Sequence, residues 1–244
     1  MSKHRRQKSW RKRVVVVAVS GVLAALGTVV VLWMVVHHIP GWYEPVDVPE
    51  SRLDEVRTDA TRCYNRFGDG VVRRKRFRIT LDERQISEWI AAREQIWPES
   101  GAWVPAWVED PIVRLRDGRI IVAARVDVNG LQCIAGAHLA IEVGSNDILV
   151  VRLEQVTVGS LPVPLGALAG PLARLLRMEG NDLDFLPVPV ADAAQYFRDS
   201  EPVAALSEGV RRANRFIWGN GRRPYRIAGI ELGDGMTKLT IEPL

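Results

Sequence analysis

The stretch that decides the fold is residues 111–158, PIVRLRDGRIIVAARVDVNGLQCIAGAHLAIEVGSNDILVVRLEQVTV. Apolar and polar residues alternate in it over four runs, which turn residues separate: 112–116, 119–129, 131–143 and 148–158. Alternation at a period of two predicts strands, and Asp117-Gly118 between the first two runs is a typical hairpin turn. Four strands joined by tight turns predict a curved antiparallel meander.

The fourth run changes its apolar phase, from Leu149, Val151 and Leu153 to Val156 and Val158. A strand that switches phase predicts a bulge or a change of buried face. Strands 119–129 and 148–158 are also apolar on nearly both faces, so helices, oligomer contacts or an apolar ligand must cover them.

Helical spacing flanks the meander on both sides. One helix is predicted to begin at Ser51 and to end at Gly68 as its C-cap. A second begins at Thr80, which forms a capping box with Glu83, and Pro98 ends it. After an abrupt stop at 159–164, helices are predicted at 168–176, 191–197 and 201–215, with an extended piece at 182–190. A hairpin of 225–232 and 236–242 closes the chain. The predicted class is α+β, a long curved antiparallel β-meander packed against several helices and preceded by one transmembrane helix.

The N-terminus predicts a membrane anchor. Seven cations and no acid lie in residues 1–13, and residues 14–36 carry no charge. Twenty-three helical residues span roughly 35 Å, enough for a bilayer core. The cations then stay in the cytoplasm, and residues 37–244 lie outside it. A signal peptide cleaved near Ala25-Leu26-Gly27 and a buried core helix are the alternatives. The predicted parts are a basic tail (1–13), a signal anchor (14–36), a Pro-containing linker (37–50) and one extracytoplasmic domain (51–244).

Four aromatic residues are predicted at the two membrane interfaces: Trp10 at the inner one, and Trp33, Trp42 and Tyr43 at the outer one. Without the seven tail cations, 26 basic residues face 29 acidic ones, a net charge of −3. The pI of 9.3 therefore does not indicate nucleic-acid binding.

Catalytic patterns are missing from the sequence. His138 is the only histidine within the predicted fold, and a lone strand histidine is usually structural. There is no nucleophile elbow, phosphate loop or zinc motif, and the paired carboxylates stand at turns and helix starts, where acids are common. We expect no enzyme activity, no catalytic residue, no cofactor and no metal site. Cys63 and Cys133 either form a disulfide, which an exported domain permits, or are two buried free thiols.

Two surface segments are candidates for binding. The loop 97–107 holds three tryptophans, of which Trp103 and Trp107 are candidates for the rim of a ligand pocket, although such aromatics also fold back as a satellite core. A dense basic run occupies residues 73–78. It is interpreted as a solvated strand edge that discourages aggregation, ahead of the alternative that it faces anionic headgroups or a wall polymer.

Two short segments carry a resemblance to a known family. ITLDERQI at residues 79–86 leads from a strand into a helix, and VTVGSLPVP at 156–164 ends the meander. With the basic tail and the single membrane helix, they resemble the YpmS-like bacterial envelope proteins over residues 10–178. That family is single-pass and has no established activity, so no catalytic residue follows from it. The segment 216–221 departs from the family. More loosely, the meander beside long helices is similar to tubular lipid-binding folds.

The leading functional hypothesis is a non-enzymatic envelope protein, anchored in the cell membrane, that binds a lipid or another apolar ligand between sheet and helices. The alternative is an envelope scaffold or assembly factor that acts through protein–protein contacts. An enzyme acting on a cell-wall or lipid substrate is a third hypothesis, which would need a pocket with several convergent polar groups.

Overall fold

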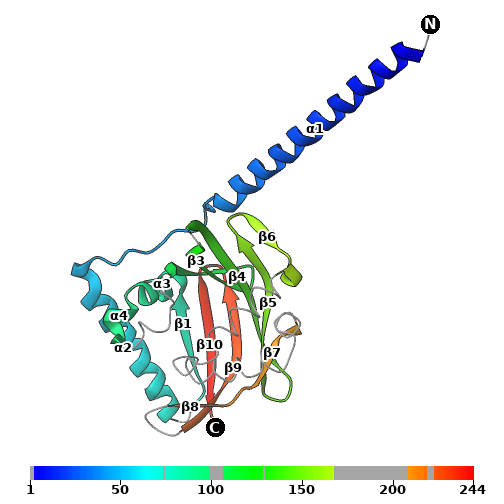
Figure 1. Ribbon diagram of the computed structural model, residues 1–244. Helices are drawn as coiled ribbons and strands as arrows, with labels where there is room; N and C mark the ends of the chain where they lie inside the picture. The colour runs from blue at the N-terminus through cyan, green and yellow to red at the C-terminus, as the bar shows by residue number, and fades with distance from the viewer. Residues whose placement is uncertain (1–2, 74, 99–106, 129, 168–207, 219–222) are drawn as a thin grey trace, which may run out of the picture.

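The computed structural model describes residues 3–73, 75–98, 107–128, 130–167, 208–218 and 223–244. A long N-terminal helix, α1 (Lys3–His37), stands off a folded part that holds two antiparallel sheets and the helices α2 (Glu50–Val72), α3 (Glu83–Ala91) and α4 (Arg93–Ile96) (Figure 1). The predicted α+β class is confirmed. Within Ser20–His37, α1 is long and apolar enough to be a membrane anchor or a signal sequence.

The larger sheet is the predicted meander. Its strands lie in the order β2 (Val108–Arg116), β3 (Arg119–Val128), β4 (Leu131–Gly144), β5 (Ile148–Val158) and β6 (Leu161–Val163). Asp117 and Gly118 both adopt positive φ, +52° and +70°, as the tight turn between β2 and β3 requires.

The change of phase in β5 is a β-bulge, as predicted. His138 on β4 pairs with Gln155, whereas the next residue, Leu139, pairs with Leu153. Glu154 is therefore the extra residue of the bulge, which keeps Val156 and Val158 on the same face of the sheet as Leu153, since their partners on β4 are Ala137, Ala135 and Leu139.

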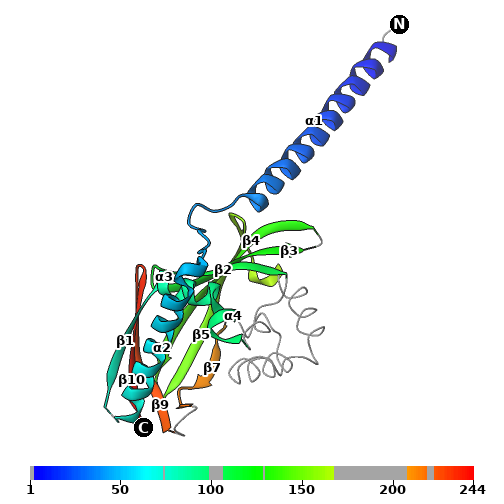
Figure 2. The same ribbon diagram turned by 90° about the vertical axis from the view of Figure 1, so that its left-hand side faces the viewer.

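The hairpin at the end of the chain forms as predicted, but it belongs to a second sheet. Its strands β9 (Arg223–Gly233) and β10 (Met236–Pro243) lie between β1 (Phe77–Asp82) and β8 (Phe216–Trp218), in the order β1-β10-β9-β8. The helices α2, α3 and α4 flank the two sheets (Figure 2).

Helix α2 does not end at Gly68 but continues to Val72. Glycine here makes room for aromatic rings, because a Cβ at Gly68 would lie 3.1 Å from the ring of Trp218 and one at Gly70 would lie 2.6 Å from that of Phe77. The absence of a side chain is therefore a packing requirement within the helix and not a helix stop.

The predicted capping box at Thr80 is also wrong. Thr80 lies within β1, and the N-cap of α3 is Asp82, whose side chain accepts hydrogen bonds from the backbone N–H groups of Arg84 and Gln85. The carboxylate of Glu83 instead accepts from the backbone N–H of Leu115 (2.8 Å). Ala92 separates α3 from α4 in what was predicted as one helix.

Two predictions after the meander are corrected. The meander does not end at residues 159–164, because β6 lies within this stretch, folds back and pairs with β5. The predicted helix 201–215 is wrong at its end, since Val210–Ala213 is strand β7, also paired with β5. The predicted helices 168–176 and 191–197, the extended piece 182–190 and residues 201–207 lie outside the described residues.

The predicted linker packs against the domain through Trp42 and Tyr43. Tyr43 is 5% exposed, forms a core cluster with Ile112, Ala123 and Ile134, and has Trp42 packed against it. The Tyr43 hydroxyl donates to the backbone oxygen of Asp110 (2.8 Å), and burial raises its pKa, with the nearby Asp110 carboxylate adding to the effect. The structure therefore places Tyr43 in the core with the partly buried Trp42 against it, and their position at a membrane interface stays a prediction.

The end of α1 is fixed to the turn between β5 and β6. The backbone N–H of Ser160 donates to the oxygen of Val35 (3.1 Å), and Nδ1 of His38 hydrogen-bonds the Ser160 hydroxyl (2.7 Å). Gly159 has φ of +58°, and a Cβ there would lie 2.3 Å from the oxygen of Val36. The close approach requires glycine, so the helix and the domain meet at one defined joint.

Candidate basic groove on α2 and β1

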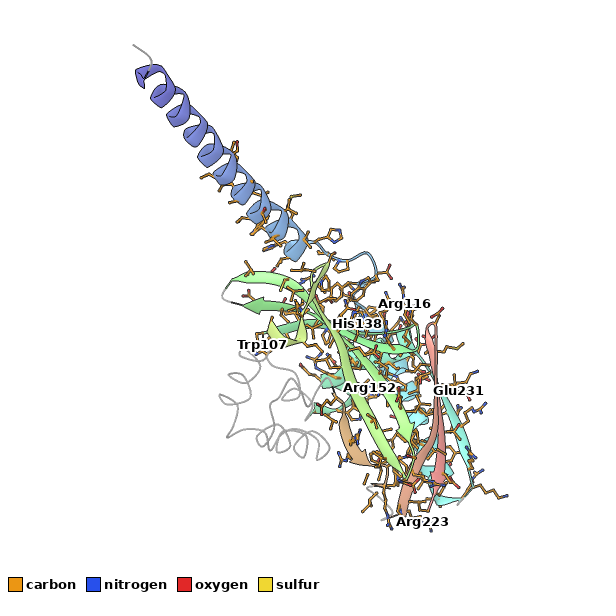
Figure 3. The ribbon with its side chains drawn as sticks, turned by 90° about the vertical axis from the view of Figure 1, so that its right-hand side faces the viewer. Trp107, Arg116, His138, Arg152, Arg223 and Glu231 are labelled. Atoms are coloured by element: carbon orange, nitrogen blue, oxygen red, sulfur yellow. The ribbon has the colours of Figure 1, made fainter. Side chains whose placement is uncertain are left out.

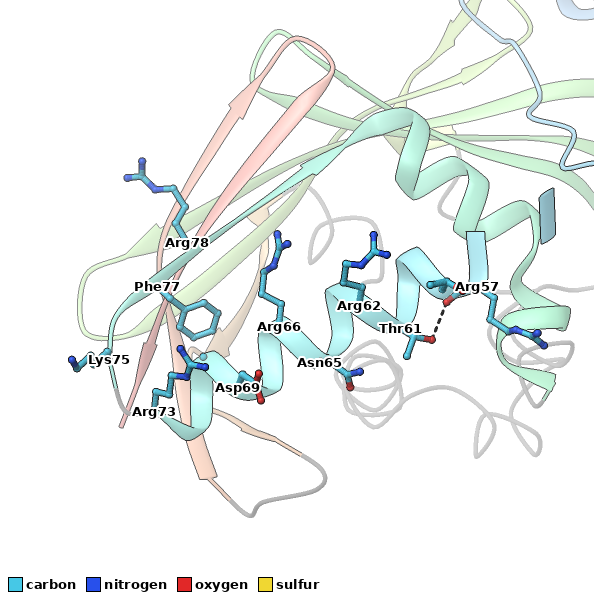
Figure 4. A pocket seen from close by; sticks show the side chains of 12 residues that line it. Arg57, Thr61, Arg62, Asn65, Arg66, Asp69, Arg73, Lys75, Phe77 and Arg78 are labelled. Carbon is cyan, nitrogen blue, oxygen red and sulfur yellow. Dashed lines mark hydrogen bonds between the residues drawn. The ribbon is translucent and has the colours of Figure 1, made fainter. Parts of the chain in front are cut away.

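A hollow of about 870 Å³ runs along the outer side of α2 to the start of β1 (Figure 4). Its lining includes six cations and a single carboxylate, Asp69. We name it the basic groove; the six cations are Arg57, Arg62, Arg66, Arg73, Lys75 and Arg78.

Helical geometry sets the spacing of these groups. Residues four apart lie on one side of an α-helix, one turn from each other, so Arg62 and Arg66 are neighbours about 6 Å apart along the axis. Figure 4 shows their side chains projecting side by side from α2. A second row on α2 is polar, with Thr61 and Asn65 among the lining residues. The stretch 57–69 covers about 18 Å of helix, which fits an extended ligand better than a compact one.

Carboxylates only partly neutralise the groove. Arg57 pairs with Asp54, and Arg78 pairs with Glu231 at 3.3 Å. Arg62 is 3.9 Å from Asp59, whose carboxylate already accepts a hydrogen bond from Gln85 (2.5 Å).

Three further cations of the groove have no ion pair with a carboxylate of the described residues. They are Arg66, Arg73 and Lys75. Exposed ion pairs are weak in any case, so the groove offers several guanidinium groups to an anionic ligand.

Aromatic packing holds α2 in place beneath the groove. Phe67 contacts the rings of Trp218 (centroids 4.9 Å apart), Tyr225 (5.1 Å) and Phe77 (5.8 Å). Burial raises the pKa of the Tyr225 hydroxyl. These rings come from α2, β1, β8 and β9, so the helix carrying the arginines is fixed to the second sheet by its inner face.

The C-terminal end of α2 lies away from α1. Arg223 donates to the backbone oxygen of Val72, the last residue of α2, and Figure 3 shows Arg223 at the end of the domain opposite α1. The end of the basic groove near Arg73 therefore lies at the end of the domain opposite α1.

Of the predicted site residues, the structure brings Trp42 and Tyr43 into contact, with ring centroids 6.3 Å apart. Trp107 is 41% exposed and lies toward the α1 side of the domain (Figure 3), whereas Trp103 lies outside the described residues. Trp33 is 60% exposed on α1, and Trp10 also lies on α1. The rim predicted from Trp103 and Trp107 remains a prediction.

The remaining chemistry-bearing side chains stand apart. Cys63 on α2 and Cys133 on β4 are free thiols, so the disulfide that the sequence allows is not formed; burial raises the pKa of each. Burial and the charge of Arg119 lower the pKa of His138, whose Nε2 is buried with no hydrogen-bond partner in the structure. Across the described part of the chain, no cluster of three or more His, Cys, Asp or Glu residues could hold a metal ion.

The sequence showed half of this site. The run at 73–78 was visible as a cluster, but Arg62 and Arg66 were not assigned to any site. A signal exists for them: on the predicted helix they fall outside the apolar stripe that includes Val56, Ala60 and Phe67. What could not be predicted is that α2 and β1 bring both sets to one hollow.

Comparisons with protein-family models, with curated proteins and with solved structures give no match for this chain. The resemblance to the YpmS-like envelope proteins and to tubular lipid-binding folds therefore stays a prediction.

Proposed function

We propose that this chain is a membrane-anchored binding protein of the cell envelope, and that its basic groove holds an extended anionic polymer on the outer side of the membrane. The observation that carries the proposal is the groove itself, whose lining along α2 and the start of β1 includes six cations and one carboxylate. Arginine suits this role because its planar fork binds phosphate or carboxylate through two N–H groups.

The proposed placement rests on α1 and the tail. A helix as apolar as Ser20–His37 that follows seven cations orients with the cations in the cytoplasm. The domain is then exported, and the position of the Arg73 end of the groove opposite α1 favours a ligand outside the bilayer over headgroups of the same membrane. The action proposed is binding without chemistry.

The hypothesis of an apolar ligand between sheet and helices stays a prediction. The basic groove, with a volume of about 870 Å³, is bordered by arginines, which favours an anionic occupant.

The test is binding of inorganic polyphosphate to the full-length chain in detergent. In every sample the seven cations of the tail are replaced by Gln, because the tail itself would bind the probe. The double variant Arg62→Gln with Arg66→Gln removes two groove cations. Each cation near an anionic surface contributes about 1 kcal/mol, so the Kd is expected to rise about thirtyfold.

A matched control removes the same charge elsewhere. Arg116 and Arg211 are exposed and lie outside the groove, so Arg116→Gln with Arg211→Gln should leave the Kd within about twofold of the parent, since exposed charges beyond a Debye length are screened. An equal loss in both double variants, or no binding by the parent at low salt, would contradict the proposal. Poly-L-glutamate in a parallel series tells whether the groove prefers phosphate or carboxylate.

A further inference from the structure

A smaller pocket lies where α1 meets the domain. It has a volume of about 280 Å³, and its lining comes from the end of α1, from Ile39 two residues beyond that end, and from β3 and β4: His37, Ile39, Arg125, Gln132, Cys133 and Ile134. We name it the joint pocket. It is separate from the basic groove, with which it shares no residue.

The joint fixes the level of this pocket relative to a membrane. Val35, which accepts the hydrogen bond from Ser160, is one residue from the end of the uncharged run 14–36, or about 1.5 Å along the helix. If α1 spans a bilayer, the parts of the domain that touch its end lie in the headgroup layer. The joint pocket then opens among lipid headgroups, without any further movement of the chain.

The groups in the pocket suit a phosphate. The Arg125 guanidinium and the Gln132 amide carry N–H donors, and no carboxylate lines the pocket among the described residues. The Nδ1–H of His37 already donates to the backbone oxygen of Trp33 (2.8 Å). Arg125 has one ion-pair partner of the described residues, Asp110 at 3.5 Å, which is itself 45% exposed. A long, exposed pair of this kind is weak, so the guanidinium remains able to bind a second anion.

Apolar side chains frame the same pocket. Ile39 in its lining is 59% exposed, and Leu131 beside Gln132 at the start of β4 is 43% exposed. Exposure of these apolar side chains to water is unfavourable, whereas at a bilayer surface they would enter the boundary between headgroups and acyl chains. In a phospholipid site we expect N–H donors that bind the phosphate to lie beside apolar side chains that contact the rest of the lipid.

We propose that the joint pocket holds the headgroup of an anionic phospholipid, with the guanidinium of Arg125 on its phosphate. The inference rests on the proposed insertion of α1, and it adds a second contact by which the domain is seated on the membrane surface. This contact keeps the Arg73 end of the basic groove directed outward.

The first test is native mass spectrometry of the full-length chain in detergent with added phosphatidylglycerol. Wild type is expected to retain one lipid, and Arg125→Gln to bind it about tenfold more weakly, because a charge-assisted hydrogen-bonded pair is lost. The control is Arg119→Gln on the same strand and face, since Arg119 is 46% exposed, Arg125 is 36% exposed, and each pairs with one carboxylate.

Three results would overturn the proposal: equal lipid binding by the wild type and Arg125→Gln, equal loss in Arg119→Gln, or displacement of the lipid by inorganic phosphate at the same concentration. The last result would assign the pocket to free phosphate. Recovery of the chain in nanodiscs reports insertion of α1 separately, so failure of the anchor and failure of the pocket are distinguished.

The second test measures depth in nanodiscs with spin labels on the full-length chain, with Cys63 and Cys133 replaced by Ser. A label at Leu131→Cys should be shielded from a water-soluble relaxation agent and accessible to oxygen. A label at Ile217→Cys, which is 70% exposed on β8, should show the reverse. Equal accessibility of the two labels to the water-soluble agent would overturn the seating of the domain on the bilayer.

Discussion

Replacement of Glu83 by Gln tests how the membrane-side segment is fixed to the fold. Glu83 begins α3, and its two carboxylate oxygens bind different groups: Nη1 of Arg114 at 2.8 Å and the backbone N–H of Leu115 at 2.8 Å. Arg114 in turn donates from Nε to the backbone oxygen of Trp42 (3.1 Å). One carboxylate thus joins α3, β2 and the segment that follows α1.

The magnitude follows from burial. The side chains of Glu83 and Arg114 are 15% and 16% exposed, so water screens their interaction only weakly. Gln keeps one acceptor oxygen but turns an N–H donor toward a guanidinium or a backbone N–H, and it leaves Arg114 without its buried counter-charge. The expected loss of unfolding free energy is about 2–3 kcal/mol, which for a domain of this size lowers Tm by about 4–12 °C.

Thermal unfolding of the full-length chain in detergent, followed by tryptophan fluorescence, measures this loss. Glu231→Gln is the control, because Glu231 and its partner Arg78 are 59% and 57% exposed and such a pair is worth less than about 1 kcal/mol. If Glu83→Gln lowers Tm no more than Glu231→Gln does, the argument that this ion pair holds the segment to the fold is refuted.

Three further predictions concern the joint, a histidine and the thiols. Gly159→Ala should unfold at a clearly lower temperature than Gly118→Ala, because both need positive φ but only a Cβ at Gly159 meets backbone atoms, whereas one at Gly118 meets nothing within 4 Å; equal Tm values would contradict the close joint. The pKa of His138 is lower in the fold than its ordinary value, so its contribution to stability is present above about pH 6.5 and is lost as the pH falls below that value. The Tm difference between wild type and His138→Phe should therefore shift against wild type between pH 7.5 and pH 5.5, and a constant difference would contradict the lowered pKa of His138. Cys63 and Cys133 should both be alkylated in denaturant without reductant, as two mass additions, and modification only after reduction would show that they are bridged.

The meander and the closing hairpin could be predicted because their information is local. Alternation, a turn at Asp117-Gly118 and a change of phase at Glu154 specify strands, a hairpin and a bulge without reference to the rest of the chain. The pairing of the closing hairpin with β1 could not be predicted in this way. The strands β1 and β10 lie more than 150 residues apart in the sequence, and the pattern of neither strand indicates which strand it pairs with.

The errors came from local signals that distant contacts override. Gly68 looked like a helix stop, but its missing side chain makes room for Trp218, 150 residues later. Glu83 looked like part of a capping box, yet its carboxylate is used by Arg114 and Leu115. The basic groove could not be predicted as a whole for the same reason, because α2 and β1 approach each other only through the tertiary packing around Phe67.

The central claim is that the basic groove binds an anionic polymer, and amide hydrogen exchange of the full-length chain, with its tail cations replaced by Gln, tests it most directly. With inorganic polyphosphate present, exchange should slow over residues 57–78, which contain the lining of the groove, and should stay unchanged in β3, β4 and β5. Slowing that is spread over the meander, or no slowing in residues 57–78 at a concentration of polyphosphate that binds, would contradict the account.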